Sequence, residues 1–470
     1  MDKLIRKERG SRMSFTYLNE ALNWLDNQQS NIPRPNLEKI ELALDYLGNP
    51  HLEIDHIIHI TGTNGKGSTS AFLKELFTQQ GLRVGTFTSP HIMYFNERFR
   101  FDGQYISDSD LLKVINQMLP VNDYMETTEF GVLTFFELYT VMAALYFKEK
   151  KPDVVLLEVG IGGFQDCTNV FPTDTQIITT IGVDHEGILG NSLESVAIEK
   201  AGIIKPNSLV IIGNVPNVAT SILVKRARRL NCNYAIYNHS YYYIEPDSLG
   251  PDGSRFKYVD HFLNPQGDEE EMEVDHTPES QVVQIQMIGE HQIQNATVAL
   301  ACFYRWMDHH ELNVEGEAVE SALKSTVWQG RMERLTSDSP MIYIDGAHNP
   351  AGLTAMKQML EQFFYDKQVT ILYTGISTKD QQSQVDLLIE MAPEELIFTE
   401  FDNYRAVPLD KFREIVDESS LTIDFPIRYE ANWRQYIQHF INEYKDNPNR
   451  MLLVTGSLYF ISQVRQNILY

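Results

Sequence analysis

A short glycine-rich segment is the feature that most constrains what this sequence can fold into. The apolar run His56–Ile60 leads directly into the segment Thr61–Thr69, Thr-Gly-Thr-Asn-Gly-Lys-Gly-Ser-Thr, and a helix is expected at Ser68–Gln80. A strand, a glycine-rich turn, a lysine and a helix in this order form a cradle for a polyphosphate. The glycines let backbone N–H groups point at oxygens, the helix N-terminus is electropositive, and Lys66 adds a full charge. A phosphate-binding α/β fold is therefore predicted.

The loop differs from the common phosphate-binding loop G-x-x-x-x-G-K-[ST]. Only Thr63 and Asn64 separate Gly62 from Gly65, and Gly67 follows the lysine where a metal-binding hydroxyl is usual. A loop of this shorter kind needs a hydroxyl from another segment to hold Mg²⁺. The alternative is a glycine-rich turn that only caps a helix.

The composition indicates a folded, acidic chain. Of its 470 residues, 43% are hydrophobic and 22% are charged, which excludes disorder as the dominant state. The net charge of −25 argues against a nucleic-acid backbone or an anionic membrane as the main partner. At ~100–200 residues per domain, the length predicts two or three domains.

The cysteines and the first residues of the sequence indicate the cellular compartment to expect. Cys167, Cys232 and Cys302 lie far apart and match no disulfide framework or metal-ligand spacing, which fits a reducing compartment. The charged start Met1–Arg12 is followed by no apolar segment, so no secretory signal is expected. No apolar run approaches the ~18 residues of a membrane helix. We expect a cytoplasmic protein.

Short apolar runs alternate with amphipathic stretches along most of the chain. This alternation predicts a parallel sheet covered on both faces. In the first part, strands are expected at Ile57–Ile60, Val84–Phe87, Val154–Leu157, Ile177–Ile181 and Leu209–Ile212, and helices at Ser68–Gln80, Leu111–Met118 and Leu133–Lys150. In the second part, strands are expected at Ile342–Ile344, Val369–Tyr373, Glu395–Phe398 and Leu452–Val454, and helices at Ala351–Phe364, Gln382–Met391, Trp433–Tyr444 and Leu458–Gln466.

The stretch between these two series has a different pattern. Residues 240–286 are polar and turn-rich and include the acidic run Asp268–Glu271, which we interpret as a solvated part of an antiparallel excursion. We therefore predict two α/β domains, at residues 1–327 and 328–470.

Three successive strand ends carry polar side chains. Ser89 follows Val84–Phe87, Glu158 ends Val154–Leu157, and His185 follows Ile177–Ile181. Carboxyl ends of parallel strands share one edge of a sheet, where ligands bind. A turn cap, a paired carboxylate and a surface or core-satisfied histidine are the alternatives.

A series of different short motifs follows in order along nearly the whole sequence. Each motif alone is only weak evidence for a family. They are Leu47–Pro50, Thr88–His91, Phe95–Arg98, Glu158–Gly163, Asp166–Asn169, Asp184–His185, Glu199–Gly202, Gly289–Gln292, Asn295–Ala296, Gly330–Arg331, Asp345–Pro350 and Gly456–Tyr459. With the short phosphate loop, this set resembles the folylpolyglutamate synthase/dihydrofolate synthase family of the Mur ligase superfamily. The resemblance implies an N-terminal Mur-ligase-like ATP-binding domain and a C-terminal Rossmann-like domain in a monomer.

The resemblance also implies the reaction. ATP would phosphorylate a carboxylate of a folate, and the amine of L-glutamate would displace the phosphate to give an amide, ADP and phosphate. Charge neutralisation and alignment of two anions are then the main catalytic tasks.

The resemblance further implies the residues that perform these tasks. It assigns Lys66, His185, Lys200 and Arg331 to catalysis; Ser89, Glu158, His185 and Lys200 to two Mg²⁺ sites; and Thr63, Asn64, Gly65, Lys66, Gly67, Ser68, Asn295, Arg331, Asp345 and His348 to ATP. Lys200 in Glu-Lys-Ala-Gly would be carbamylated by CO₂; by sequence alone it would be a solvated helix lysine. Arg331 and Asp345 have an interdomain salt bridge and a helix cap as alternatives.

The folate would contact two further segments in the resembling enzymes. They correspond here to Thr134, Phe135, Phe136, Glu137, Gln165, Asp166 and Cys167. The aromatic rings could stack on a flat pterin or belong to a helix core. The family commonly has an arginine where this chain has Phe164, which favours the polyglutamating activity over a bifunctional enzyme that also uses dihydropteroate.

Other classes of protein remain as alternatives. A cell-wall Mur ligase would need a UDP-binding domain, yet only about 55 residues precede the first strand. A P-loop NTPase motor is disfavoured by the short loop, and a folate-binding scaffold by Lys66, Glu158 and His185.

Overall fold

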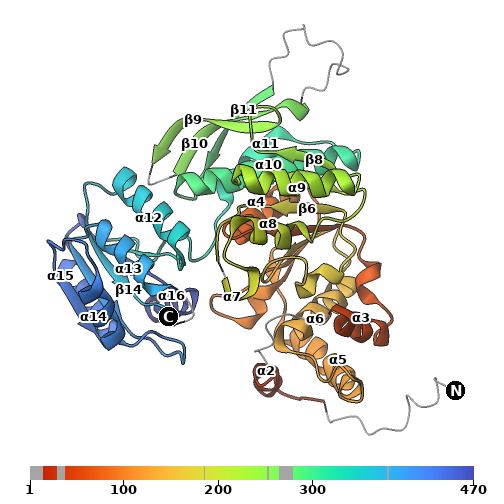
Figure 1. Cartoon of the computed structure of the whole chain (residues 1–470), viewed down its shortest axis with the longest axis horizontal. Coiled ribbons are helices and arrows are strands. Elements are labelled where there is room, and N and C mark those ends of the chain that lie inside the picture. The colour runs from red at the N-terminus through yellow and green to blue at the C-terminus, as the bar shows by residue number, and fades with distance from the viewer. Residues whose placement is uncertain are drawn as a thin grey trace. The chain divides into compact units, whose positions relative to one another are not determined.

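The computed structural model describes residues 14–28, 37–184, 186–250, 253–263, 279–377 and 380–469 (Figure 1). The chain forms two compact units. The first comprises Met1–Lys66, Leu76–His91 and Phe95–Ile236, and the second comprises Gly67–Glu75, Ile92–Tyr94 and Tyr237–Tyr470. These units group the chain by compactness and have no boundary between residues 327 and 328. The predicted domain boundary at that point stays a prediction.

An eight-stranded sheet forms the centre of the first unit. Its order is β4-β3-β2-β5-β1-β6-β7-β8, parallel from β2 to β8, with β3 and β4 added as an antiparallel hairpin. The strands are β1 (Ile57–Thr61), β2 (Val84–Phe87), β3 (Phe99–Phe101), β4 (Gln104–Tyr105), β5 (Val154–Glu158), β6 (Thr175–Ile178), β7 (Leu209–Ile212) and β8 (Asn233–Ile236). The central strands are buried along their whole length, as their continuous apolar runs predict.

Helices pack on this sheet through two apolar clusters. One joins α2, α3, α5 and α6 to β1, β2 and β5, and the other joins α8 and α9 to β6 and β7. The helices of this unit are α2 (Leu18–Asp26), α3 (Leu37–Tyr46), α5 (Asp108–Glu126), α6 (Phe135–Lys150), α7 (Glu186–Leu189), α8 (Leu193–Ala201) and α9 (Asn217–Arg229). Helix α4 (Lys66–Gln79) has residues in both units, since Gly67–Glu75 is grouped with the second. The predicted α/β class with a covered, mostly parallel sheet is confirmed.

The second unit contains a small antiparallel sheet, β9 (Tyr242–Gly250), β10 (Gly253–Asp260) and β11 (Glu279–Ile285), in the order β11-β10-β9. It lies beside α10 (Glu290–His309) and α11 (Gly316–Ser325) (Figure 1). A buried ion pair fixes this arrangement, since the Arg305 guanidinium on α10 donates to both carboxylate oxygens of Asp260 on β10 at 2.7 and 2.8 Å. The acidic run Asp268–Glu271 lies outside the described residues.

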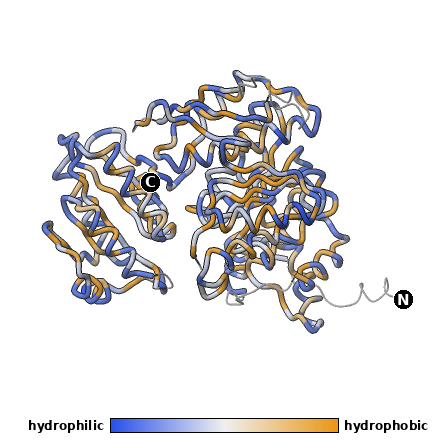
Figure 2. The backbone as a smooth tube through the Cα atoms, turned by 45° about the horizontal axis from the view of Figure 1, so that its top comes forward, coloured by the Kyte–Doolittle hydropathy of each residue, from blue (hydrophilic) through white to orange (hydrophobic). Residues whose placement is uncertain are grey.

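A six-stranded sheet forms the rest of the second unit, in the order β12-β13-β17-β14-β15-β16. It is parallel except for β12. Its strands are β12 (Glu333–Arg334), β13 (Met341–Ile344), β14 (Gln368–Tyr373), β15 (Glu395–Thr399), β16 (Ile427–Glu430) and β17 (Arg450–Thr455), and its helices are α12 (Pro350–Phe363), α13 (Gln381–Glu390), α14 (Leu409–Glu418), α15 (Trp433–Tyr444) and α16 (Leu458–Leu469). Two apolar clusters fill the space between the helices and the two faces of this sheet, and the inner strands are largely hydrophobic (Figure 2).

Candidate active site

The phosphate loop is anchored on the segment that follows β6. The Asn64 N–H donates to the Thr180 hydroxyl at 2.9 Å, and the Asn64 carbonyl accepts from the hydroxyls of Thr179 and Thr180 at 2.6 and 3.0 Å. A Cβ added at Gly62 would lie 1.9 Å from the Thr179 hydroxyl, so only glycine fits there. The loop is therefore held in place by its neighbours before any phosphate binds.

One strand boundary in the sequence prediction is wrong. A strand was expected over Ile177–Ile181, but β6 is Thr175–Ile178. The main chain of Thr179 and Thr180 still bonds Thr61 and Thr63 at 2.9 and 3.0 Å, and their hydroxyls bond the phosphate loop. Nothing in the local sequence pattern distinguishes them from further strand residues.

Lys66 begins α4 and turns back over the loop. Its ammonium donates to the Gly62 carbonyl at 2.9 Å, and Gly65 before it adopts a left-handed φ of 87°. The first N–H groups of a helix have no partner within the helix. Lysine and helix N-terminus together give a positive concavity suited to phosphate oxygens.

Packing explains why residue 67 is a glycine, although a hydroxyl residue is usual at this position. A Cβ at this position would lie 2.9 Å from the indole ring of Trp328. Real Cβ contacts are almost never this short, so the ring and a side chain at residue 67 exclude each other. The missing hydroxyl thus follows from Trp328, and another segment must supply a metal-binding oxygen.

Ser89 and Glu158 meet at the carboxyl edge of the sheet. Glu158 ends β5 with its carboxylate buried, and its Oε2 accepts the backbone N–H of Ser89 at 3.1 Å. The predicted juxtaposition of these strand ends is therefore present. His185, the third member of the predicted set, lies outside the described residues.

Lys200 is buried rather than solvated. It lies in the last turn of α8 with 3% of its surface exposed. Burial, together with the positive charge of Lys66, lowers the pKa of Lys200 to about 7, although Asp184, Asp166 and Glu199 oppose the shift. An amine of this kind is largely neutral at slightly alkaline pH, which is the form that reacts as a nucleophile.

The double glycine after β5 lets α8 approach. Gly162 has a left-handed φ of 76°, and a Cβ at Gly163 would lie 2.9 Å from the Glu199 carbonyl. The Gly162 carbonyl also accepts the hydroxyl of Thr61 at the end of β1, at 2.7 Å. The loop that follows Glu158 is thus held between the phosphate-loop strand and the helix that carries Lys200.

Gln165 and Asp166 differ in what they have available for a ligand. Both oxygens of buried Asp166 accept main-chain N–H groups, from Ile161 and from Thr168, each at 2.9 Å. Burial nevertheless raises the pKa of Asp166. Gln165 instead has a buried amide oxygen without a hydrogen-bond partner among the described residues. Gln165 is therefore the better placed of the two to receive a donor from a substrate.

The predicted substrate residues at the start of α6 also differ in whether they are available for a ligand. Glu137 accepts the Thr134 N–H at 2.7 Å as part of a capping box and forms a buried ion pair with Lys39 at 2.9 Å. Phe135 and Phe136 are half-buried, and the Phe136 ring packs directly over Gly160. The rings can line a site, while Thr134 and Glu137 hold the start of the helix. Cys167 is buried, and burial raises the pKa of its thiol.

His91 and Arg98 form a contact that the sequence interpretation did not assign. The Arg98 Nε–H donates to Nδ1 of His91 at 2.9 Å. Burial and the Arg98 charge lower the pKa of His91 to about 3. Both residues lie in motifs that were noted in the sequence, which was the only signal available for them.

In the second unit, Arg331 and Asp345 are brought together. Asp345 accepts the Met332 N–H at 2.9 Å and the Ala347 N–H at 2.8 Å, which ties the segment after Arg331 to the end of β13. A Cβ at Gly346 would lie 2.4 Å from the Arg331 guanidinium, so glycine makes room for it. The pKa of His291 is lowered by burial, with Asp345 and Arg331 as its charged neighbours.

The other predicted nucleotide residues of this unit have local partners. The buried Asn295 amide on α10 donates to Gln292 at 3.0 Å, and Nδ1 of His348 lies 2.8 Å from the Gly346 carbonyl. Gly346 is thus flanked by Arg331 and His348, which puts two of the predicted nucleotide residues side by side.

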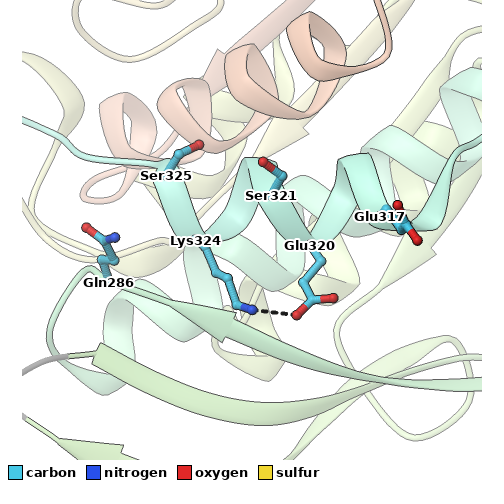
Figure 3. A pocket seen from close by; sticks show the side chains of 6 residues that line it. All are labelled: Gln286, Glu317, Glu320, Ser321, Lys324 and Ser325. Carbon is cyan, nitrogen blue, oxygen red and sulfur yellow. Dashed lines mark hydrogen bonds and ion pairs between the residues drawn. The ribbon is translucent and has the colours of Figure 1, made fainter.

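A surface groove of about 460 Å³ lies elsewhere in the second unit (Figure 3). Its lining combines α11 with the end of β11, and Lys324 pairs there with Glu320 at 2.5 Å. The lining residues are Gln286, Glu317, Glu320, Ser321, Lys324 and Ser325. None of these six residues was predicted to bind nucleotide, metal or folate, and all six are polar or charged.

Among the described residues, no helix is both long enough and apolar enough to cross a membrane. The three cysteines are buried and form no disulfide within the described part of the chain.

Comparison with known proteins identifies the family. The family model of the Mur ligase middle domain matches residues 60–303, and that of the Mur ligase glutamate ligase domain matches residues 330–458. A dihydrofolate synthase/folylpolyglutamate synthase of Bacillus subtilis is 32% identical over 97% of this chain and 100% of its own length. A folylpolyglutamate synthase of Lacticaseibacillus casei is 29% identical over 92% of this chain and 94% of its own.

A solved structure gives the same answer. The folylpolyglutamate synthase of Mycobacterium tuberculosis complexed with ADP and AMPPCP aligns with a TM-score of 0.82 and 26% identity, covering 96% of this chain and 98% of that one. The chain therefore belongs to the Mur ligase superfamily and, within it, to the dihydrofolate synthase/folylpolyglutamate synthase family.

Proposed function

We propose that this protein is an ATP-dependent ligase that adds L-glutamate to a carboxylate of (tetrahydro)folate through an acyl phosphate, releasing ADP and phosphate. The observation that carries the proposal is a braced phosphate loop whose Lys66 lies in the same unit as the strand-end carboxylate Glu158 and the buried amine of Lys200. Full-length relatives of the same family are named for this activity.

ATP would bind through main-chain donors and one lysine. The segment Thr63–Ser68 offers the loop and first-turn N–H groups, and Lys66 can exchange the Gly62 carbonyl for phosphate oxygens. From the second unit, Asn295, Arg331, Asp345 and His348 are the proposed nucleotide contacts. Asp345 uses one lone pair of each oxygen on the main chain, and each oxygen has a second for a ribose hydroxyl.

Magnesium ions fit the carboxyl edge of the sheet. Ser89, Glu158, His185 and Lys200 are the proposed ligands of two sites, and the buried Glu158 carboxylate is the hard oxygen donor that Mg²⁺ prefers. Bound Mg²⁺ would neutralise charge on the phosphates of ATP. The Ser89 N–H on Oε2 fixes the orientation of the Glu158 carboxylate.

Lys200 is proposed to carry a carbamate. Its neutral amine would attack the carbon of CO₂ and lose one proton to solvent, which converts a cation into an anionic oxygen donor. The burial that lowers the pKa of Lys200 to about 7 supports this proposal, because it makes the neutral amine available. The carbamate charge would also be opposite to that of Lys66.

The chain's own groups then account for the two chemical steps. A folate carboxylate oxygen attacks the γ-phosphorus of ATP, ADP leaves, and Lys66 and Arg331 stabilise charge on the phosphoryl oxygens. The neutral amine of glutamate next attacks the acyl carbon, the resulting tetrahedral species expels phosphate, and the amine loses a proton. Gln165, Phe135 and Phe136 would orient the folate, with the buried Gln165 oxygen accepting from its polar edge.

Two further properties complete the proposal. We place the enzyme in the reducing cytoplasm, which is consistent with its buried, unbridged cysteines, and we expect it to act as a monomer. Use of dihydropteroate as a second substrate is the alternative function, because the similar Bacillus subtilis enzyme is named for both activities.

The direct test is product analysis. Incubation with Mg-ATP, L-glutamate and tetrahydrofolate should release ADP and extend the folate by one glutamate, as seen by mass spectrometry. ADP release that needs no folate would instead favour an NTPase, and folate binding without turnover would favour a scaffold.

A further inference from the structure

The loop after β2 brings a histidine close to the predicted reaction centre. Ser89 in this loop is bonded to Glu158 through its N–H, which fixes the loop at the carboxyl edge of the sheet. His91 lies two residues further along and is half-buried. Any group held by His91 is therefore near the strand end at which the metal-binding carboxylate lies.

A buried arginine holds His91 from behind. Arg98 is 6% exposed, and its guanidinium lies over the rings of Tyr139, Phe95 and Phe135 at 4.8, 5.8 and 5.9 Å from their centroids. It donates its Nε–H to Nδ1 of His91 at 2.9 Å. Three aromatic contacts and a hydrogen bond leave this guanidinium little freedom to move.

The direction of this hydrogen bond determines the state of the histidine. A guanidinium has donors only, so Nδ1 of His91 must be the acceptor and cannot carry hydrogen. The ring is therefore the Nε2–H tautomer, and Nε2 is a hydrogen-bond donor. Within the described part of the chain, the bond from Arg98 is the hydrogen bond that the His91 ring makes, and Nε2–H donates to no protein acceptor.

One of the rings next to the Arg98 guanidinium belongs to the segment of α6 that is predicted to contact the folate. Phe135, under the Arg98 guanidinium, begins α6, and the next residue, Phe136, packs over the glycine loop that follows Glu158. Arg98 thus links His91 to the aromatic start of α6, while the loop that carries His91 is joined to the strand end at Glu158 through Ser89. In the proposed function, a folate would have its pterin ring on the aromatic side chains of α6 and its reacting carboxylate near the phosphate-binding loop.

We propose that His91 is a further catalytic residue, which donates its Nε2–H to the reacting carboxyl group of the folate and to the oxyanion formed when glutamate attacks the acyl carbon. Arg98 is the positioning residue that fixes the tautomer. The proposal rests on the proposed ligase function and adds a donor to it. A neutral donor suits this position, because it stabilises developing negative charge without forming a tight ion pair with the substrate carboxylate.

Two isosteric variants separate a catalytic donor from a structural link. His91→Asn keeps an oxygen near the Nδ1 position to accept from Arg98 but removes the donor at Nε2. His91→Gln keeps an N–H near the Nε2 position but removes the acceptor for Arg98. His439→Asn, at an exposed histidine of α15, is the matched control.

We expect His91→Asn to lower kcat/KM for tetrahydrofolate by about 10- to 100-fold, the range for a hydrogen bond to a charged group, with the KM for ATP and the melting temperature unchanged. His91→Gln should retain several-fold more activity than His91→Asn, and the control should match the wild type. Wild-type kcat/KM in His91→Asn would overturn the proposal.

The opposite order of activities, with His91→Asn above His91→Gln, would also overturn it and show a structural link to Arg98. A wild-type protein without glutamate ligation would overturn the proposed function itself, whereas an active wild type with an unaffected His91→Asn variant would overturn only the role of His91.

Discussion

The main-chain N–H of Ser89 donates to Oε2 of Glu158 at 3.1 Å, and this bond joins the carboxyl ends of two neighbouring parallel strands. It orients a buried carboxylate at the sheet edge beside the phosphate-loop strand. An acceptor that is fixed by a main-chain donor keeps its remaining lone pairs in defined directions. The fold therefore fixes the orientation of the carboxylate that we propose as a Mg²⁺ ligand.

Glu158→Gln tests this metal assignment. The amide oxygen can still accept from Ser89, so the fold should be retained, but the charge needed by Mg²⁺ is lost. Activity at saturating ATP should fall at least ~100-fold, and the Mg²⁺ concentration for half-maximal rate should rise. A magnesium titration with thermal unfolding as control checks this result; unchanged magnesium dependence would remove Glu158 from the metal site.

Gly67→Ser would restore the hydroxyl that common phosphate loops carry after the lysine. Because a Cβ there meets Trp328 at 2.9 Å, the variant should lose about 1–3 kcal/mol of stability and gain no activity. Gly316→Ser, in the first turn of α11 with open space around it, is the matched control and should unfold like the wild type. A fully stable Gly67→Ser protein with increased activity would show that the Trp328 contact is not limiting.

Asp166 and Gln165 are neighbours with opposite expected effects. Asp166→Asn replaces one acceptor of a main-chain N–H by an amide donor, which should cost about 1–3 kcal/mol of unfolding free energy. Denaturant unfolding measures this loss. A stable Asp166→Asn protein whose only defect is a raised KM for folate would instead make Asp166 a substrate contact.

Gln165→Ala should leave stability nearly unchanged and raise the KM for tetrahydrofolate several-fold, because its buried amide oxygen has no protein partner among the described residues. Steady-state kinetics at saturating ATP and glutamate give the KM. A large loss of stability with normal kinetics would assign Gln165 to the fold.

Lys200 makes stability depend on pH in a defined direction. Its pKa is about 7 in the folded chain against an ordinary 10.5, so between these values the unfolded chain holds a proton that the folded chain has released. Stability of the wild type therefore rises with pH over this window. In CO₂-free buffer, Lys200→Met should exceed the wild type in unfolding free energy most below pH 7, and the difference should shrink towards pH 10.5. A difference that does not vary with pH would show that Lys200 is solvated.

The sequence predicts strands and helices with a clear apolar pattern well and the long-range contacts poorly. The strands β2 and β7 and the helix α15 occur at the predicted residues, because continuous apolar runs and a 3.6-residue period are local signals. The hairpin β3–β4 was not predicted, because strands of three and two residues are too short to show a pattern. Helix α14 was also not predicted, although its sequence is amphipathic and buries Phe412 and Ile415 on one face. The order of the strands also depends on pairings that no local pattern encodes.

The site shows the same division. The phosphate loop and the strand-end Glu158 were identifiable because their residue types and spacing carry the chemistry. The burial of Lys200, the Trp328 ring against Gly67 and the bond from Arg98 to His91 depend on residues 7 to 261 positions apart in the chain, and only the folded structure reveals them.

The most direct test of the account is ADP release in the presence of Mg-ATP, with tetrahydrofolate and dihydropteroate compared at matched concentrations, each with and without L-glutamate. We predict glutamate-dependent turnover with tetrahydrofolate and a product heavier by one glutamate residue. Turnover with dihydropteroate as well would add the second activity of the family. A folded, ATP-binding protein that turns over neither substrate would contradict the account.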